Sequence, residues 1–459
     1  MSEANQSEVK SAPRRLRPTI LALGPGIVLA GGVVGSGELI NTPLQAANFG
    51  FLLLWAVVIA CLIKYCLQVE IGRHCIVHDR SVFEAMNITP GPRFFGASWL
   101  IWSFMAAWTI AQVGSAGMIG ALAGIMHGLM PLPEGLGVDT SVQVWAVFVF
   151  VLAIGLMWKG IYSHFEKMII GLVITFSVIV LIGLYMLQGT DYRITGADMV
   201  SGFTFSLGDD SRKAAFAVIA LMGGLGVSGI ELLVYPYWIR EKGYSRFLGA
   251  SDSEGWDERA RGWIRIMKID AAAATLTAAI ITAAFFLLGA AILHRQGIQP
   301  EGIGVVNQIS KIFTGTYGNW SRGLFLFGAF CTLFSTLLHA MGANGRIYTD
   351  FFCSIGWVDR TNSMQVNKSH RFMQNIFLVS VLIIYLLVPK NPAALVILSH
   401  YLIGLVGTPI AIIAILILAF KTDSRVRMNR VTSVIFVASV SVILLCVGIG
   451  FAYQQGWIQ

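Results

Sequence analysis

The chain contains few charged residues for its length. Of its 459 residues only 12% are Asp, Glu, Lys or Arg, whereas soluble domains carry roughly 25%. A soluble protein of this size would need more charge to cover its surface, so the scarcity excludes a soluble enzyme and a disordered regulator. The apolar share of 56% and the mean hydropathy of +0.72 instead indicate a membrane protein that crosses the bilayer several times.

Several motifs are also absent. The six cysteines form no Cys-x-x-Cys pair and lie in or near apolar runs, which predicts reduced packing residues and no disulfide framework or zinc site. There is no P-loop, which argues against ATP-driven transport by this chain, and no His-Glu-x-x-His or Gly-x-Ser-x-Gly motif of a hydrolase. We therefore expect a protein that is not an enzyme and that holds no cofactor other than a transported cation.

Long apolar runs are what the sequence does contain. A spanning helix needs about 20 apolar residues, and the runs do not alternate as the strands of a membrane barrel would. They predict an all-α integral membrane protein with about 11 transmembrane helices, at residues 20–47, 51–73, 97–127, 142–158, 164–187, 213–239, 264–293, 320–345, 371–388, 392–420 and 431–453.

The positive charges predict how the chain is oriented. With the N-terminus in the cytoplasm, 24 of the 32 Lys and Arg residues fall on the cytoplasmic side and seven on the other, while Lys64 lies inside the second run. This places the C-terminus outside the cytoplasm. We expect the protein to lie in the cell (inner) membrane. The same loops explain the net charge of +8, so the expected partners are the lipid bilayer and a small cation, possibly with protons, and no nucleic acid. The oligomeric state stays open, and a monomer is compatible with the sequence.

Glycines interrupt the first and sixth runs near mid-span. The first reads Gly35-Ser36-Gly37-Glu38, and the sixth reads Gly226-Val227-Ser228-Gly229-Ile230-Glu231. Two such segments, five helices apart, are typical of inverted-repeat transporters, in which the freed backbone groups line a binding cavity. We expect the two helices to be unwound near residues 35–38 and 226–230. The alternative is that the glycines only permit close helix packing.

A charge at the bilayer centre costs at least roughly 2.5–3.5 kcal/mol, so both glutamates should face a cavity or be protonated. Glu38 and Glu231 are therefore candidates for substrate binding, metal binding and proton coupling. Lys64 is either a counter-charge to them or a residue that extends to the cytoplasmic face. His400, in the tenth run, is a candidate ligand or proton carrier, or else a core histidine bonded to a carbonyl. The other candidate binding residues are Gly35, Ser36, Gly37, Ser228, Gly229 and Ile230.

Several short segments resemble a known family. Gly24-Pro25-Gly26 and the run Ala46-Ala47-Asn48-Phe49-Gly50, with Leu53-Leu54-Trp55 and Gln68, are similar to the first two helices of the Nramp (natural resistance-associated macrophage protein) family of metal ion transporters. The resemblance extends through most of the chain. It implies a LeuT-type fold with a 5+5 inverted repeat and broken helices 1 and 6. The implied parts are a cytoplasmic tail (1–17), the first repeat (18–190), the second repeat (191–421), and helix 11 with the C-terminus (422–459).

The site motifs of that family are changed here. Its helix-1 motif Asp-Pro-Gly-Asn stands as Gly35-Ser36-Gly37-Glu38, and its helix-6 motif Met-Pro-His falls on Ser228-Gly229-Ile230. Thr109 and Gln112 stand where helix 3 usually carries proton-path carboxylates, and a polar ligand position of helix 10 falls on His400. Loss of the thioether removes a preference for softer ions. Two glutamates with backbone carbonyls suit a hard cation such as Mg²⁺ or Ca²⁺, or a proton-coupled organic cation.

The resemblance and the two broken runs together predict a secondary transporter or uniporter. It would move a cation, with a divalent metal as the family default, through a central site between helices 1 and 6. The alternatives are transport of a non-metal solute such as an organic cation, and a sensor or scaffold that does not transport.

Overall fold

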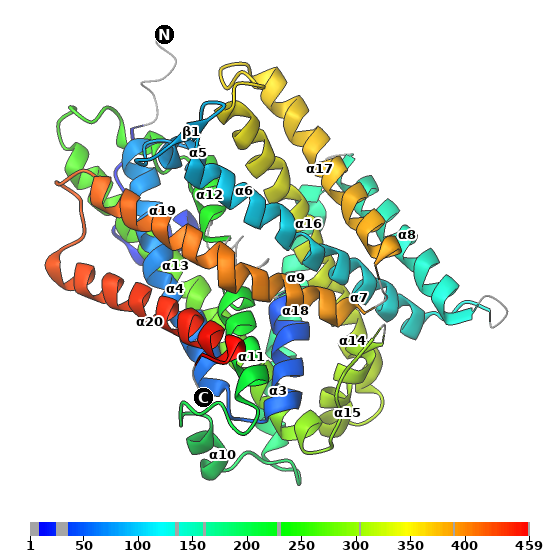
Figure 1. Cartoon of the computed structure of the whole chain (residues 1–459). Coiled ribbons are helices and arrows are strands. Elements are labelled where there is room, and N and C mark those ends of the chain that lie inside the picture. Colours follow the sequence, from blue (N-terminus) through cyan, green and yellow to red (C-terminus); the bar gives the residue numbers. More distant parts are fainter. Residues whose placement is uncertain are drawn as a thin grey trace.

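The computed structural model describes residues 9–23, 35–133, 137–158, 162–226, 231–302, 304–388 and 391–457. Within these ranges the protein is a bundle of helices, and its only strands are the short antiparallel pair β1 (Arg93–Phe94) and β2 (Ala97–Ser98) (Figure 1). The all-α membrane class predicted from composition is confirmed.

The first half of the chain contains three long unbroken helices and several shorter ones. Its elements are α1 (Leu16–Ala22), η2 (Gly37–Asn41), α3 (Thr42–Phe49), α4 (Leu54–His78), α5 (Val82–Met86), α6 (Trp99–Ala111), α7 (Val113–Leu129), α8 (Gly137–Trp158), α9 (Tyr162–Leu187) and α10 (Gly196–Ser201).

The second half contains the longest helices. Its elements are α11 (Ser211–Gly224), η4 (Glu231–Leu233), α12 (Tyr235–Glu241), η5 (Arg246–Leu248), α13 (Trp256–Leu288), η6 (Gly289–His294), α14 (Val305–Ile309), α15 (Lys311–Tyr317), α16 (Ser321–Ser354), α17 (Ser363–Leu387), α18 (Pro392–Leu402), η7 (Ile403–Gly407), α19 (Thr408–Lys421) and α20 (Arg430–Gln455).

Eight helical spans among the described residues are long and apolar enough to cross a membrane. They are α4, α6–α7, α8, α13–η6, α16, α17, α18–α19 and α20. The remaining three predicted runs correspond to α9 and to the two interrupted segments, α1–α3 and α11–α12. The total of eleven spans therefore stays a prediction.

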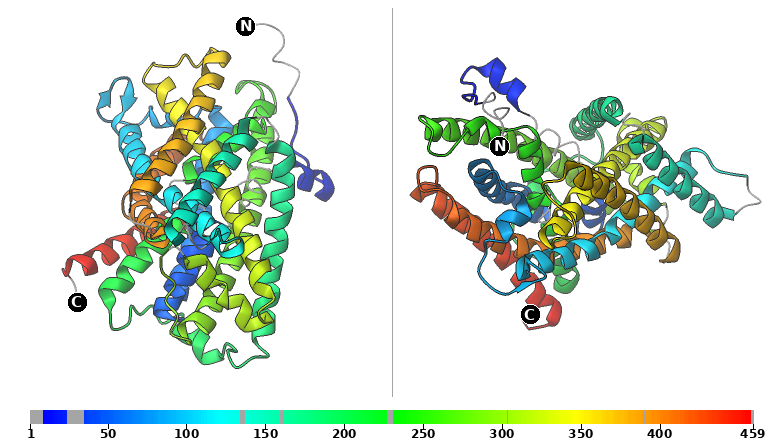
Figure 2. Two further views of the ribbon diagram at one scale, coloured as in Figure 1. Left: turned by 90° about the vertical axis from the view of Figure 1, so that its right-hand side faces the viewer. Right: turned by 90° about the horizontal axis from the view of Figure 1, so that it is seen from above.

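The helices pack in matched pairs. Extensive contacts join α4 to α13, α7 to α8, and α16 to α17, while α11 lies against α4, α18 and α20. Figure 2 shows the same bundle from two further directions. With the spans numbered in chain order, α6–α7 and α8 are spans 3 and 4, and α16 and α17 are the equivalent spans 8 and 9 of the second repeat. In the same way α4 is span 2, and its contact partner α13 is the equivalent span 7. This is the arrangement that an inverted repeat requires.

Most of the segment 35–38, which we predicted to be unwound, is helical. Gly35 is a bend, but helical geometry begins at Ser36 and continues through η2 and α3. The physical reason is the side chain of Glu38, which accepts the backbone N–H of Gly35 three residues earlier (3.0 Å) and so caps the start of the helix. Helix α1 ends at Ala22, and residues 24–34 between the two helices lie outside the described residues.

The second interruption lies close to its predicted position. Helix α11 ends at Gly224, Leu225 is extended, and Gly226 has a φ of +61°, a conformation that glycine adopts without steric cost. The chain resumes at Glu231 in one turn of 3₁₀-helix followed by α12. Residues 227–230 lie outside the described residues.

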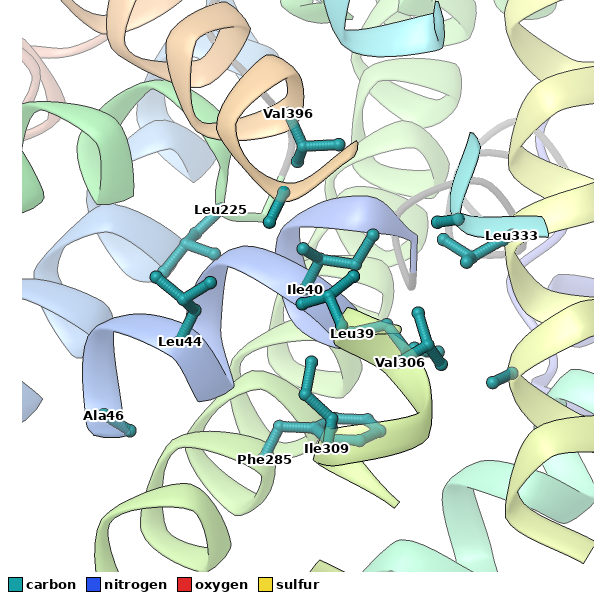
Figure 3. Close-up of a cluster of buried hydrophobic side chains, with 14 of the residues drawn as sticks. Leu39, Ile40, Leu44, Ala46, Leu225, Phe285, Val306, Ile309, Leu333 and Val396 are labelled. Carbon is teal, nitrogen blue, oxygen red and sulfur yellow. The ribbon is translucent and has the colours of Figure 1, made fainter. Parts of the chain in front are cut away.

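A buried apolar cluster fixes the half-helix that follows the first interruption. Leu39 and Ile40 are fully buried, and Figure 3 shows them among Phe285, Ile309 and Val396 from three other helices. In a membrane bundle such side chains stabilise the arrangement through close van der Waals packing. The half-helix η2–α3 is therefore held rigidly, with Glu38 at its first turn.

Candidate functional site

A cavity of about 100 Å³ lies where the two interrupted segments meet. Its wall comes from η2, α6, α7, α11, η4, α16 and α18, so both halves of the chain contribute. The cavity-lining residues with polar side chains are Ser36, Glu38, Trp108, Gln112, Ser115, Glu231, Thr336, His339, Asn344, Ser399 and His400. Gly35 and Gly37 also line it.

Glu38 is only 1% exposed and makes two hydrogen bonds. One carboxylate oxygen accepts the N–H of Gly35, and the other accepts the hydroxyl of Thr282 on α13 at 3.2 Å. A carboxylate has about four lone-pair positions, so capacity remains for a ligand in the cavity. Glu38 therefore both caps a helix and faces the cavity.

Glu231 approaches the cavity from the other interrupted segment. It is half-buried in the single 3₁₀ turn with which helical structure begins again, and its charge interacts with that of Glu38. The two carboxylates thus converge on one space from opposite halves of the chain. Two carboxylates in one cavity repel each other unless a cation or a proton lies between them.

Lys64 is buried and caps a broken helix. Its Nζ donates a hydrogen bond of 2.7 Å to the carbonyl oxygen of Leu225, at the C-terminal end of α11. A positive charge is favourable there because the helix dipole leaves partial negative charge on the last carbonyls. The ammonium also lies within charge-interaction range of Glu38 and Glu231. Of the two roles weighed for Lys64, the fold therefore favours a central counter-charge over extension to the surface.

His400 lies in the cavity wall, 8% exposed, and its Nδ1 makes no hydrogen bond within the described part of the chain. This argues against the alternative of a core histidine bonded through Nδ1 to a carbonyl. The neighbouring Ser399 uses its hydroxyl on the carbonyl of Ala111 (2.6 Å), which fastens α18 to α6. His339 of α16 lines the same space.

A hydrogen-bonded chain of neutral polar side chains lines the wall contributed by α6 and α16. Trp108 Nε1 donates to Asn344 Oδ1 (2.7 Å), and Asn344 Nδ2 donates to Gln112 Oε1 (3.3 Å). Gln112 also donates to the carbonyl of Trp108. Thr109 bonds instead to Tyr348 (2.8 Å) and is not among the cavity-lining residues that the structure describes. Gln112 lies in the site, but Thr109 does not.

Close backbone contact explains part of the glycine content. A methyl group on Gly37 would overlap the carbonyl oxygen of Gly224, and one on Gly224 would overlap the ring of His400. The two interrupted segments and α18 therefore meet at van der Waals distance. Glycine serves close packing here, which was the alternative to a binding role, and it also shapes the cavity.

Three of the predicted binding residues, Ser228, Gly229 and Ile230, lie outside the described residues. In the described ranges no group of three or more His, Cys, Asp or Glu side chains is arranged to hold a metal ion. Any cation held by Glu38 and Glu231 must complete its coordination with neutral oxygens, nitrogens or water.

Several lining residues were not predicted from the sequence. Asn344 is an isolated amide within a long apolar helix, and its position there was a usable signal. Met118, which lines the cavity, and Thr282, which bonds to Glu38 from α13, gave no such signal, because a threonine or a methionine in a spanning helix is ordinary. Met118 places a thioether in the wall, although the methionine of the helix-6 motif is absent.

Comparison with known proteins decides the family. The model for "Natural resistance-associated macrophage protein-like" (Nramp) matches residues 26–453, almost the whole chain. The chain belongs to the Nramp family. It is a multi-pass integral membrane protein, and the resemblance inferred from its first two helices is confirmed.

Two curated relatives are distant. An uncharacterised protein of Pasteurella multocida is 23% identical over 331 residues, covering 71% of this chain and 69% of the relative. The divalent metal cation transporter MntH of Caldanaerobacter subterraneus is 22% identical over 311 residues, covering 68% of each. Among solved structures, MhsT in complex with L-phenylalanine is similar with a TM-score of 0.53 and 14% identity, covering 97% of this chain and 99% of that one. This last likeness supports the LeuT-type fold of the Nramp-family chain.

Proposed function

We propose that this Nramp-family protein is a secondary transporter or uniporter that moves a cation through the cavity between its interrupted helices. The observation that carries the proposal is the convergence of Glu38 and Glu231, one from each interrupted segment, on a single polar cavity within the apolar bundle. Carboxylates are expensive in a membrane interior unless they serve a site. A divalent metal is the favoured cargo, because a divalent metal cation transporter is among the chain's relatives.

The cavity donors suit a hard and partly hydrated ion. Two carboxylates, the amides of Gln112 and Asn344, and water are oxygen ligands of the kind that Mg²⁺ and Ca²⁺ prefer. The imidazole of His400 adds one nitrogen. A small protein ligand set favours an ion that keeps several waters, and Mg²⁺ is the ion that gives up its water most reluctantly.

The carboxylate pair also offers a route for proton coupling. Without cargo, one proton between Glu38 and Glu231 relieves their repulsion, and cation entry displaces it. Glu38 and Glu231, rather than a helix-3 carboxylate, then supply the exchangeable proton. Gln112 cannot ionise, so its part is to position water or cargo.

We further propose that the N-terminus lies in the cytoplasm and the C-terminus outside, in the inner membrane of the cell. The segment before α1 supports this, because the backbone N–H of Lys10 bonds to the carbonyl of Phe247, in the Arg-rich connection between α12 and α13 (3.1 Å). In Figure 1 the C-terminal end of α20 lies toward α10 and α15, away from the end that holds β1 and the α16–α17 connection.

Uptake by purified protein in liposomes tests the function. Mn²⁺, Mg²⁺, Ca²⁺ and an organic cation are offered in turn, with internal pH followed by a trapped dye. We expect uptake of a divalent metal and a pH change that accompanies it. Uptake of the organic cation alone would reject the metal assignment, and no uptake of any of the four would favour a sensor or scaffold.

A further inference from the structure

Two imidazoles lie together far from the transport cavity. His74 and His78 occupy successive turns of α4 near the end that we place in the cytoplasm, with ring centroids 4.5 Å apart and 43° between the ring planes. The spacing of four residues puts both side chains on one face of the helix. Neither residue lines the cavity, and the proposed transport does not use them.

One ring nitrogen of His74, Nε2, is a buried acceptor. The other ring nitrogen, Nδ1, lies 3.1 Å from the carbonyl oxygen of Leu418 and 3.2 Å from the hydroxyl of Thr422. A carbonyl can only accept, so Nδ1 carries the hydrogen and Nε2 presents its lone pair. This Nε2 is buried and makes no hydrogen bond to any part of the chain that the structure describes.

His78 presents a second buried nitrogen of the same kind. Its ring rests against the backbone of Lys421 at the end of α19, and its Nε2 is also buried without a hydrogen bond in the described ranges. Two neighbouring acceptors buried without a donor are unfavourable, since each loses its bond to water and gains nothing in exchange. A ligand that accepts both lone pairs removes that cost.

We propose that His74 and His78 form a two-histidine site for a borderline divalent transition metal ion such as Zn²⁺, with water completing its coordination. Imidazole nitrogen is a preferred ligand of Zn²⁺, Cu²⁺ and Ni²⁺, and a pair of histidines four residues apart on a helix is a recurring half-site for zinc. The bond from His74 to the Leu418 carbonyl is the outer contact that orients metal-bound histidines.

The surrounding charges allow such an ion and limit its affinity. The positive charges that face the rings are those of Arg80 and Lys421, and Lys421 uses its ammonium on the carbonyl of Ile88. The negative charge is Asp423, which interacts with His78. Hydrogen bonding from Arg425 lowers the pKa of Asp423, so the carboxylate stays ionised near neutral pH. His78 as a whole is half-buried, although its Nε2 itself is buried.

Titration calorimetry with Zn²⁺ on the purified full-length protein tests the site. The background carries Glu38→Gln and Glu231→Gln, so that the transport cavity does not contribute. We expect one Zn²⁺ per chain, and His78→Gln should weaken binding by at least about tenfold, with His74→Gln doing the same. The matched control is His370→Gln on α17, a single imidazole whose Nε2 is likewise buried without a hydrogen bond in the described ranges. This control should leave Zn²⁺ binding unchanged.

A spectroscopic measurement separates coordination from an indirect effect. Cu²⁺ bound to the same background protein should show electron paramagnetic resonance couplings to two imidazole nitrogens, and to one after His78→Gln. If His74→Gln does not fold, His78→Gln decides, because the His78 ring is partly exposed. Absence of Zn²⁺ binding by the background protein, as expected if water fills the gap, overturns the proposal. Equal binding by His78→Gln, or equal loss in His370→Gln, also overturns it.

Discussion

Replacing Glu38 by glutamine separates the charge of this residue from its structural role. The carboxylate accepts one hydrogen bond from Gly35 and one from Thr282. Glutamine can keep both contacts, since its oxygen accepts from Gly35 and its amide donates to the Thr282 oxygen. In the native protein the single Thr282 hydroxyl hydrogen is shared between Glu38 and the carbonyl of Ala278 (2.7 Å), and in the variant it donates to that carbonyl alone. The free energy of unfolding should therefore change by no more than about 1 kcal/mol.

The effect on transport should be far larger. A cation about 4 Å from a carboxylate gains roughly 4 kcal/mol for each unit of its charge at an effective dielectric constant of 20. Loss of that term lowers the affinity by on the order of a thousandfold for each unit of the cation's charge, so a divalent ion loses more than a monovalent one. Glu38→Gln and Glu231→Gln should each abolish uptake. Because the two carboxylates act as a pair, the double variant should be little worse than either single one.

Uptake into liposomes and melting temperature, measured on the same three variants, give the answer. Glu258→Gln, an exposed change at the start of α13, serves as the control and should alter neither quantity. The opposite pattern is normal uptake by Glu38→Gln together with a higher melting temperature. That result would mean that Glu38 is only a helix cap, and the proposed role of the pair would be refuted.

Four further outcomes follow from the same contacts. Lys64→Met should lower the unfolding free energy by about 1–3 kcal/mol, because it leaves the Leu225 carbonyl buried without a donor. The control Lys213→Met, at a solvent-exposed ion pair, should leave the melting temperature unchanged, and equal melting temperatures for the two variants would contradict the capping role. Gly224→Ala should lower the melting temperature and block uptake by pushing His400 out of place, whereas Gly448→Ala, which meets open space, should leave both intact or raise stability slightly. Thr282→Val should reduce uptake, because it removes the hydroxyl that bonds to Glu38. The control Thr275→Val, two turns earlier and without a hydroxyl bond in the described ranges, should not reduce uptake, and equal uptake by both variants would reject a positioning role for Thr282. Mn²⁺ should bind no more than about tenfold more tightly than Mg²⁺, and a stronger preference that Met118→Ala removes would show that Met118 supplies the missing thioether.

The membrane class and the positions of the unusual segments follow from local patterns in the chain. Bilayer thickness imposes long apolar runs on any spanning helix, so these runs are visible without a structure. Glycine and a lone glutamate in the middle of such a run are equally visible, because both are costly in lipid. Glu38 and Glu231 therefore emerged as a pair, and the structure places both at one cavity.

What those residues contact follows instead from the way the helices pack. Helical geometry starts at Ser36 because the Glu38 side chain caps it, and Thr282, 244 residues away in sequence, supplies the second bond to that carboxylate. Lys64 meets the Leu225 carbonyl across 161 residues. Contacts of this kind leave no periodic or local pattern in the chain, since they depend on how separate helices cross. The spacing of apolar residues and the presence of helix-breaking residues are local properties of the sequence. The partner of a buried polar group depends instead on how separate helices pack.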